Sequence, residues 1–402
     1  MLPPTGADFT AAASALGYFY QVRYALVVLL QSQNPESIIS IEKLDDIAFE
    51  EDGEPVQLLQ TKHHVTHTGS LTDSSSDLWK TLRVWAVSAR SGLFNLDSVI
   101  LSLVTTASAP ADSAAALLRS DTGRNVLVAL DKLRMAGEAS TSAIVRQSFD
   151  EFQALSPVEQ EKLLGCIRVL DIAPDITEAR QLLEDRLRYS TRQQFLSGLC
   201  DRLEGWWFSR AVEHLKNPDL IKGIPQRLVQ VQINDLAEQF RLDNLPNDFP
   251  FPVDLDESDL SADERVFVEQ LKLVLVSNER IKRAISDYYR AFQQRSKWVR
   301  EDLLLDRELE VYETRLVSEW EELFLRMKEN LTEEANHAVA GRNLYNNIID
   351  MPRHIPIRPS FLDPFVMRGS FHILANSLKV GWHPQFRERL ARALEIAMKS
   401  VA

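Results

Sequence analysis

The chain has 402 residues and a formal net charge of −13 at neutral pH, with 45% hydrophobic and 26% charged residues. This composition is that of a globular protein, and the length exceeds what one hydrophobic core usually organises, so two or three domains are expected. The acidic charge argues against a protein that binds nucleic acid through a broad basic surface, because phosphate neutralisation drives that kind of binding.

The N-terminus and the cysteines bear on cellular location. Residues 1–4 are not followed by a basic segment and a signal-length apolar core, and the apolar run at 25–30 is too short to cross a bilayer. Cys166 and Cys200 lie in no C-x-x-C pattern, which favours buried thiols over a disulfide or a zinc site. We therefore expect a cytoplasmic protein that is not embedded in a membrane.

A helix followed by three strands is expected at the start of the chain. Residues 9–32 carry apolar side chains at helical spacing, and Gly17 within them is expected to let a neighbouring segment approach closely. Through residues 39–49 the apolar side chains alternate at period two, as in strands. Asp52-Gly53 then predicts a tight turn, so residues 46–51 and 55–62 are expected to pair as an antiparallel hairpin.

Four polar side chains are expected to meet near one end of this small sheet. Glu42 ends the first strand and Asp46 begins the second, while Gln60 and Lys62 share one face of the third and Thr61 points away. Carboxylate oxygens are ligands that Mg²⁺ prefers, and bound Mg²⁺ stabilises phosphoryl oxygens and lowers the pKa of an attacking water. A lysine beside that water favours hydroxide and the developing negative charge.

This chemistry predicts a Mg²⁺-dependent nuclease, with Mn²⁺ as a substitute metal. Asp46 is expected to be the principal metal ligand, Glu42 to supply a second carboxylate, and Gln60 to offer a side-chain or neighbouring main-chain oxygen. Lys62 is expected to orient the attacking water as the catalytic cation. A second interpretation stays open, in which the four residues are ordinary polar side chains on a solvent-facing hairpin.

A series of motifs gives the hairpin a family resemblance. An acidic residue that begins one strand, followed by Gln-x-Lys on the next, resembles the PD-(D/E)xK nuclease superfamily in its Gln variant. The wider series resembles the nuclease domain of bacterial anti-phage effector endonucleases, which include the effectors of cyclic-oligonucleotide (CBASS) systems and the A subunit of Lamassu systems. It covers roughly the first half of the chain and consists of GYFYQ at 17–21, IE at 41–42, DDI at 45–47, QTKH at 60–63 and DLWK at 77–80.

The end of the chain carries a second resemblance. Residues 368–376 (RGSFHILAN) and 381–384 (GWHP) are similar to the C-terminal domain of three-component systems built around an SMC-like ATPase, which favours the Lamassu-type subunit. The resemblance implies a resting complex with that ATPase and a small accessory subunit, and cleavage of double-stranded DNA by a homo-oligomer. It also implies that Gln21 faces the active site, although residue chemistry alone fits a partly exposed helix position equally well.

Helices and strands are expected to alternate through the rest of the N-terminal half. Ser156-Pro157-Val158-Glu159 has the form of a capping box with proline at the first helical position. The apolar patterns predict strands at 97–106 and 166–172, and helices at 77–90, about 113–119, 123–136, 141–153, 176–190 and 192–216.

The C-terminal half is expected to be mostly helical. After a helix at 226–240, the Phe-Pro alternation at 245–252 favours an extended conformation, lying either along a partner or on its own domain. A capping box at 261–264 is expected to open one long helix that continues to Phe292, and another long helix is expected at about 299–330. Residues 341–367 are punctuated by prolines, and a final helix is expected at about 384–399.

These expectations define an α/β (α+β) restriction-endonuclease-like N-terminal domain with a mostly α-helical C-terminal domain. Residues 1–216 are assigned to the nuclease domain, 217–258 to a helix and proline-rich linker, and 259–402 to assembly and partner binding. No Walker A motif is present, so an associated ATPase would be a separate subunit. The expected function is a DNA endonuclease subunit of an anti-phage complex, held inactive by partners and activated by release or oligomerisation. The alternative is a non-catalytic, nuclease-like scaffold subunit.

Overall fold

The computed structural model describes residues 11–51, 54–63, 69–218, 221–256, 263–332, 336–351 and 355–391. The chain forms two compact units, Met1–Ala237 and Glu238–Ala402. Their division falls inside the 217–258 segment that the sequence assigns to a helix and linker. The predicted fold class is confirmed, with a mixed sheet and helices in the first unit and a mostly helical second unit. No helix among the described residues is long and apolar enough to span a membrane.

The first unit is built on a six-stranded sheet in the order β5-β4-β3-β2-β1-β6. β1 (Ile38–Ile41), β2 (Ile47–Glu51) and β3 (Glu54–Lys62) pair antiparallel, so the predicted hairpin is confirmed, although its Asp52-Gly53 turn lies outside the described residues. β4 (Ile100–Thr105) and β5 (Ile167–Leu170) continue the sheet in parallel with β3. β6 (Ile224–Pro225), which the sequence pattern does not predict, pairs with β1 at the other edge.

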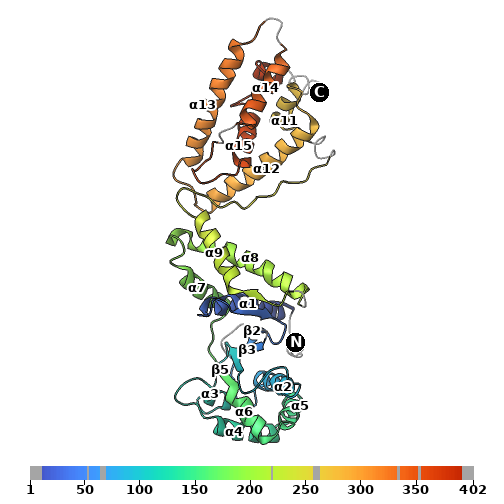
Figure 1. The fold of residues 1–402 in the computed structure, drawn as a ribbon, viewed down its shortest axis with the longest axis vertical. Coiled ribbons are helices and arrows are strands. Elements are labelled where there is room, and N and C mark those ends of the chain that lie inside the picture. The colour runs from blue at the N-terminus through green and yellow to red at the C-terminus, as the bar shows by residue number, and fades with distance from the viewer. Residues whose placement is uncertain are drawn as a thin grey trace, which may run out of the picture. The chain divides into compact units, whose positions relative to one another are not determined.

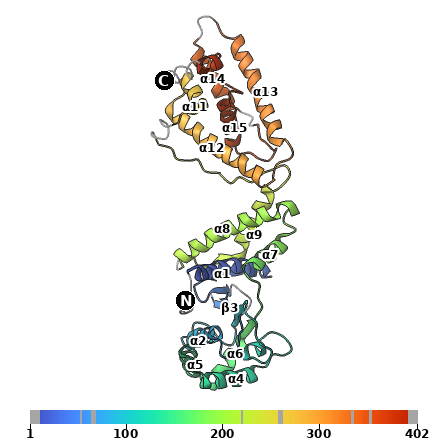
Figure 2. The same cartoon turned by 180° about the vertical axis from the view of Figure 1, so that it is seen from behind.

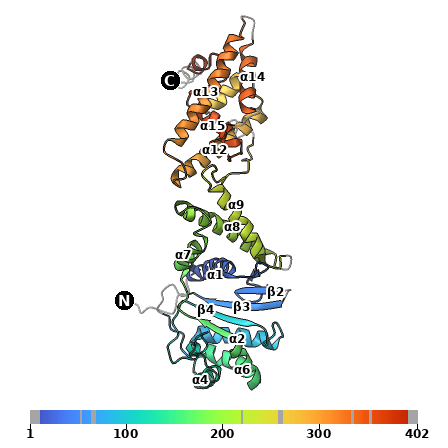
Figure 3. The same cartoon turned by 60° about the vertical axis from the view of Figure 1, so that its left-hand side comes forward.

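Helices cover both faces of this sheet (Figure 3). α1 (Ala11–Gln31), α7 (Ile176–Leu187) and α8 (Leu196–Lys216) lie on one face. η1 (Gln193–Phe195) leads into α8, and α9 (Gln226–Gln239) follows β6 in the chain. The opposite face carries α2 (Ser76–Arg90), α3 (Ala114–Leu117), α4 (Val126–Ala139), α5 (Ala143–Gln153) and α6 (Pro157–Cys166). α2 is the crossover that the parallel pair β3 and β4 requires.

Aromatic packing joins the helices on the α2 side of the sheet. Trp79 is fully buried, and its ring meets Phe149 and Phe152 edge-on at centroid distances of 5.7 and 6.5 Å. Edge-to-face contacts of this kind add to the free energy gained by burying large apolar surfaces. The capping box at Ser156 is also confirmed, since its side chain and that of Glu159 exchange hydrogen bonds with each other's main chain.

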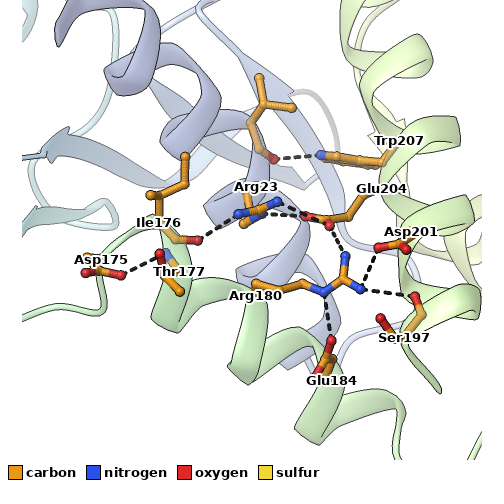
Figure 4. A network of polar contacts seen from close by, with 11 residues as sticks. Arg23, Asp175, Ile176, Thr177, Arg180, Glu184, Ser197, Asp201, Glu204 and Trp207 are labelled. Carbon is orange, nitrogen blue, oxygen red and sulfur yellow. Dashed lines mark hydrogen bonds and ion pairs between the residues drawn. The ribbon is translucent and has the colours of Figure 1, made fainter. Parts of the chain in front are cut away.

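A shared carboxylate fixes α1 against α7 and α8 (Figure 4). Glu204 of α8 accepts hydrogen bonds from Arg23 of α1 and Arg180 of α7. Arg23 also donates to the carbonyl oxygen of Ile176 at 2.8 Å, and the Trp207 indole donates to that of Val22 at 2.7 Å. α1 is therefore held in one orientation above the sheet.

Gly17 in α1 does not have the packing role that the sequence suggests. No described heavy atom lies within 4 Å of the position that a Cβ atom would take there. The expected close approach of a neighbour is wrong, because this part of α1 borders open space.

In the second unit, two helices lie where one long helix was predicted (Figures 1 and 2). α11 (Val266–Leu273) starts with Arg265 at its N-cap, and the chain then turns through Leu275, whose φ is 59°. α12 (Asn278–Arg300) follows. The capping box predicted at 261–264 was expected to begin this helix. Of its residues the structure describes 263 and 264, and for these the prediction is wrong, because the Asp263 carboxylate pairs with Arg265 and caps no helix.

The remaining helices also begin at positions that differ from the prediction. α13 (Glu308–Glu329) starts later than residue 299, because α12 continues to Arg300 and two left-handed residues, Asp302 and Arg307, then turn the chain. α14 (His337–Ile349) and α15 (Phe365–Asn376) flank the proline-punctuated region. The helix predicted at 384–399 is described only as far as residue 391, where residues 386–391 are helical, and its second half lies outside the described residues.

The Phe-Pro segment, residues 245–256, packs within the second unit along α12. The Asp248 amide donates to Gln294 at 2.7 Å, and the Val253 amide donates to Ser286 at 2.8 Å. Between these points the Arg290 guanidinium donates to the carbonyl oxygens of Phe249 and Pro250 at 2.9 and 2.8 Å. Of the two interpretations of this segment, the structure therefore shows packing on its own unit.

Candidate active site

Asp46 lies at the centre of the polar cluster that the sequence predicts. Its Oδ1 accepts a hydrogen bond from Gln60 Nε2 at 3.0 Å. Its Oδ2 accepts from both the amide and the hydroxyl of Thr61, at 2.7 and 2.9 Å. The register of β2 and β3, with Ile47 opposite Leu59, brings these residues together.

Thr61 was expected to point away from the cluster, and this expectation is wrong. Asp46 precedes the first paired residue of β2, so the alternation of the sheet does not fix its side chain. Its carboxylate reaches the edge of β3 and meets the main chain and hydroxyl of Thr61.

Glu42 is joined to the same cluster through α1. It follows β1 in a left-handed conformation with φ of 56°, and its amide donates to the Asp46 carbonyl oxygen at 3.1 Å. Gln21 Nε2 donates to that same oxygen at 2.6 Å, so Gln21 faces the cluster, as the family resemblance implies. Partial burial and the charge of Asp46 raise the pKa of Glu42, and a hydrogen bond with Gln21 and the charge of Lys62 oppose that rise.

Asp45 is a further member of the cluster, which the sequence analysis did not assign to the site. Burial raises its carboxyl pKa to about 7, and the charge of Asp46 adds to this rise. Its Oδ2 accepts a hydrogen bond from the Trp85 indole at 2.6 Å, and its Oδ1 accepts from the Asp46 amide at 3.0 Å. The signal for it was the Asp45-Asp46 doublet, which was noted only as part of the family motif.

Lys62 supplies positive charge at the end of β3. Its charge lowers the pKa of both Glu42 and Asp45, so it interacts electrostatically with both carboxyl groups. Its main-chain oxygen accepts from the Thr105 hydroxyl at 3.2 Å and the Thr106 amide at 3.3 Å, which fixes this end of β3 beside β4. The structure thus gathers all four predicted residues at one end of the sheet.

α1 contributes an aromatic side to the region. The Tyr20 ring is buried, with its centroid 4.7 Å from that of His63, the residue after β3. Tyr24 stacks on Tyr20, with a distance of 5.4 Å between the ring centroids. Burial, aided by nearby Tyr24, raises the pKa of the Tyr20 hydroxyl above its usual range, so this group stays protonated at neutral pH.

The donor set bears on whether a metal fits. Among the residues that the structure describes, no three His, Cys, Asp or Glu side chains converge in a way that could hold a metal ion. Mg²⁺ is commonly held by only one or two carboxylates, keeping several waters, and Asp46 with Glu42 offers that number. The oxygen atoms of these side chains are the kind of ligand that a hard cation prefers. The charge of Asp46 repels those of Glu42 and Asp45, and a bound cation would relieve this repulsion.

The comparison with known families concerns the second unit. Residues 267–390 match the model of C-terminal domain 7 of the ABC-three component (ABC-3C) systems. The match supports a bacterial protein of anti-phage defence, and it covers α11 to α15 but none of the sheet. No curated protein matches the chain.

The residues that suggested this C-terminal resemblance are structural. Trp382 is fully buried, and its amide donates to Gln270 at 3.3 Å. The carbonyl oxygen of Gly381 accepts from the Trp320 indole at 2.9 Å, and Asn376 accepts from the amide at the start of α11. The motif therefore joins α11, α13 and α15 around one core.

Proposed function

We propose that the protein is a metal-dependent DNA endonuclease that acts as a subunit of an anti-phage defence complex. The observation that carries this proposal is the contact of Asp46 with Gln60 at the ends of two adjoining strands, with Glu42 and Lys62 in the same charged cluster. Carboxylates and a lysine are the groups that metal-dependent hydrolysis of a phosphodiester uses.

Each residue has a defined role in this proposal. Asp46, Glu42 and the side-chain or neighbouring main-chain oxygen of Gln60 would hold Mg²⁺ or Mn²⁺. When bound, the metal supplies positive charge for the phosphoryl oxygens and lowers the pKa of a water. Lys62 orients that water and stabilises the negative charge that develops. Gln21 holds the Asp46 main chain in place from α1.

The proposed assembly follows from the chemistry and the C-terminal domain. Cutting both strands of a duplex requires two active sites, so the active form is a homo-oligomer. The ABC-3C match supports further subunits, for which we propose an SMC-like ATPase and a small accessory protein. The net charge of −13 keeps the affinity of a free subunit for DNA low, which suits an enzyme held inactive until its partners release it.

Plasmid cleavage tests the proposal. Wild type, Lys62→Ala and Lys162→Ala are incubated with plasmid and Mg²⁺ or Mn²⁺, alone and with any ATPase that is encoded beside the gene. Lys162 is a matched control, because its ion pair with Asp97 is solvent-exposed. We expect cutting by wild type and Lys162→Ala and none by Lys62→Ala. Equal cutting by all three proteins would point to a contaminating nuclease and reject the assignment.

A non-catalytic scaffold is the second candidate function. One observation favours it, since both oxygens of Asp46 are already satisfied by protein hydrogen bonds. Under this alternative, no cutting occurs with or without the ATPase, while binding to that subunit persists in Lys62→Ala. The same set of proteins therefore separates the two candidates.

A further inference from the structure

A cavity of about 650 Å³ lies within the second unit. Residues of α12, α14 and α15 line it together with residues 252–255 of the Phe-Pro segment. Its volume is in the range of small-molecule sites. The charged side chains that line it are the cations Arg280, Lys282, Arg283, Arg290 and Arg368 and the carboxylates Asp254, Glu279, Asp287 and Asp350.

Three of these carboxylates already have a cation. Asp287 lies 3.3 Å from Arg290, Asp350 lies 3.7 Å from Arg280, and Glu279 lies 3.5 Å from Lys282. The fourth carboxylate, Asp254, is exposed on the Phe-Pro segment. Five cations and four carboxylates line the cavity, so its lining carries one positive charge in excess.

Arg283 and Arg368 form no ion pair among the residues that the structure describes. Arg368 uses its Nε to donate to the Ile349 carbonyl oxygen at 3.2 Å. Arg283 is exposed at the cavity. A guanidinium group presents several N–H donors in a plane, and it pairs preferentially with phosphate and carboxylate oxygens. The cavity therefore holds two positive groups that are available to an anion.

His372 adds a buried polar group to the cavity wall. Its side chain is 1% exposed, and its Nδ1 atom has no hydrogen-bond partner within the described residues. Burial, aided by the nearby charge of Arg368, lowers its pKa to about 3, so the ring is neutral at pH 7. At pH 7 His372 therefore adds no positive charge beside Arg368.

The cavity walls are fixed by contacts that need no ligand. Arg290 binds two carbonyl oxygens of the Phe-Pro segment, which holds that segment on α12. α12 and α15 approach so closely at Gly369 that an added Cβ would lie 2.1 Å from the Asp287 carbonyl oxygen. A site built on rigid elements loses little conformational freedom when it binds.

We propose that this cavity binds a small phosphate-bearing molecule of up to nucleotide size. Arg283 and Arg368, which both line the cavity, pair with the phosphate. The inference does not depend on the nuclease proposal, because every residue in it belongs to the second unit. It gives that unit a role as a ligand-responsive domain.

Titration calorimetry of the full-length protein with AMP and with inorganic phosphate tests the inference. We expect wild type to bind AMP, and Arg283→Glu and Arg368→Gln to weaken binding about tenfold or more. Arg315→Glu is the matched control, since Arg315 is exposed in the middle of α13 and does not line the cavity. Urea unfolding of each variant verifies the fold, and the exposure of Arg283 makes its substitution the safer of the two.

Each outcome bears on the proposal. Tighter binding of AMP than of phosphate supports a nucleotide-sized ligand, and equal binding that Arg283→Glu abolishes supports a site for phosphate itself. Absence of binding of either probe at millimolar concentration overturns the proposal. Equal weakening by Arg315→Glu also overturns it, because the attraction is then a general effect of charge.

Discussion

Asp46 accepts three hydrogen bonds on one carboxylate, and the hydroxyl of Thr61 donates one of them. Thr61→Val removes that hydroxyl and keeps the shape of the side chain. We expect the free energy of unfolding to fall by about 1 kcal/mol, because the lost bond ends on a charged group in a partly buried place. Urea unfolding of the full chain measures this change.

Thr81 in α2 provides the matched control for that substitution. Its side chain is 1% exposed, and its hydroxyl has no hydrogen-bond partner among the described residues. Thr81→Val removes an unsatisfied buried donor, so the free energy of unfolding should stay constant or rise. If both substitutions destabilise the protein equally, the Thr61 hydroxyl bond contributes nothing specific.

At this scale the sequence predicts residues on regular strands better than residues at strand ends. Gln60 and Lys62 follow from period two on β3, and Asp46 follows from the hairpin register. Asp45 and Thr61 do not, because their contacts depend on the path of the chain before β2 and on the Trp85 indole from another element. Such contacts between distant segments have no periodic signal in one sequence.

The Glu204 side chain of α8 links α8 to α1 and α7. Its carboxylate, 17% exposed, serves Arg23 and Arg180 at once. Glu204→Gln removes the carboxylate that pairs with Arg23, while Arg180 keeps Glu184 and Asp201, so we expect a loss of about 2 kcal/mol in the free energy of unfolding. Since α1 carries Gln21, this variant should also weaken any cleavage activity, which a plasmid assay would measure.

The exposed pair of Arg90 and Glu151 is the comparison for this effect. It joins α2 to α5, with side chains 41% and 38% exposed. Glu151→Gln should change the free energy of unfolding by less than about 0.5 kcal/mol, because solvent screens the pair. A similar loss in both variants would mean that the Glu204 network has no advantage over a surface ion pair.

Gly369 sets the distance between α12 and α15. A Cβ atom there would lie 2.1 Å from the Asp287 carbonyl oxygen and 2.4 Å from the Ala291 Cβ. Because both contacts involve groups that cannot rotate away, Gly369→Ala should destabilise the second unit by about 3 kcal/mol. Gly17→Ala, in open space on α1, should instead stabilise its helix by up to about 1 kcal/mol. Thermal unfolding of both variants tests this contrast.

At the scale of elements, the sequence predicts most helices and strands but misplaces several ends. The predicted long helix breaks at Leu275, which carries no glycine or proline signal. Its left-handed turn follows from the packing of α11 and α12 against α15, and such tertiary contacts override local propensity. β6 was missed because two residues are too short to show a period.

For the whole molecule, the division between Ala237 and Glu238 predicts independent folding of the two units. Calorimetry of the full chain should show two unfolding transitions. Fragments 1–237 and 238–402 should each reproduce one of them and keep helical circular dichroism. A single transition, with neither fragment folded, would contradict this division.

The alternating pattern of the first half and the helical periods of the second half were enough to predict the fold class.

The sheet order also has a consequence for the newly made chain. β1 is complete by residue 41, yet its outer neighbour β6 arrives only at residues 224–225. The helices that hold α1 over the candidate site, α7 and α8, likewise lie more than 140 residues after it. At a synthesis rate of about 5–20 residues per second, the hairpin with Asp46 and Lys62 leaves the ribosome many seconds before β6, α7 and α8 have been synthesised. The site therefore reaches its final form only when the first unit is nearly fully translated, which delays any cleavage activity until late in synthesis.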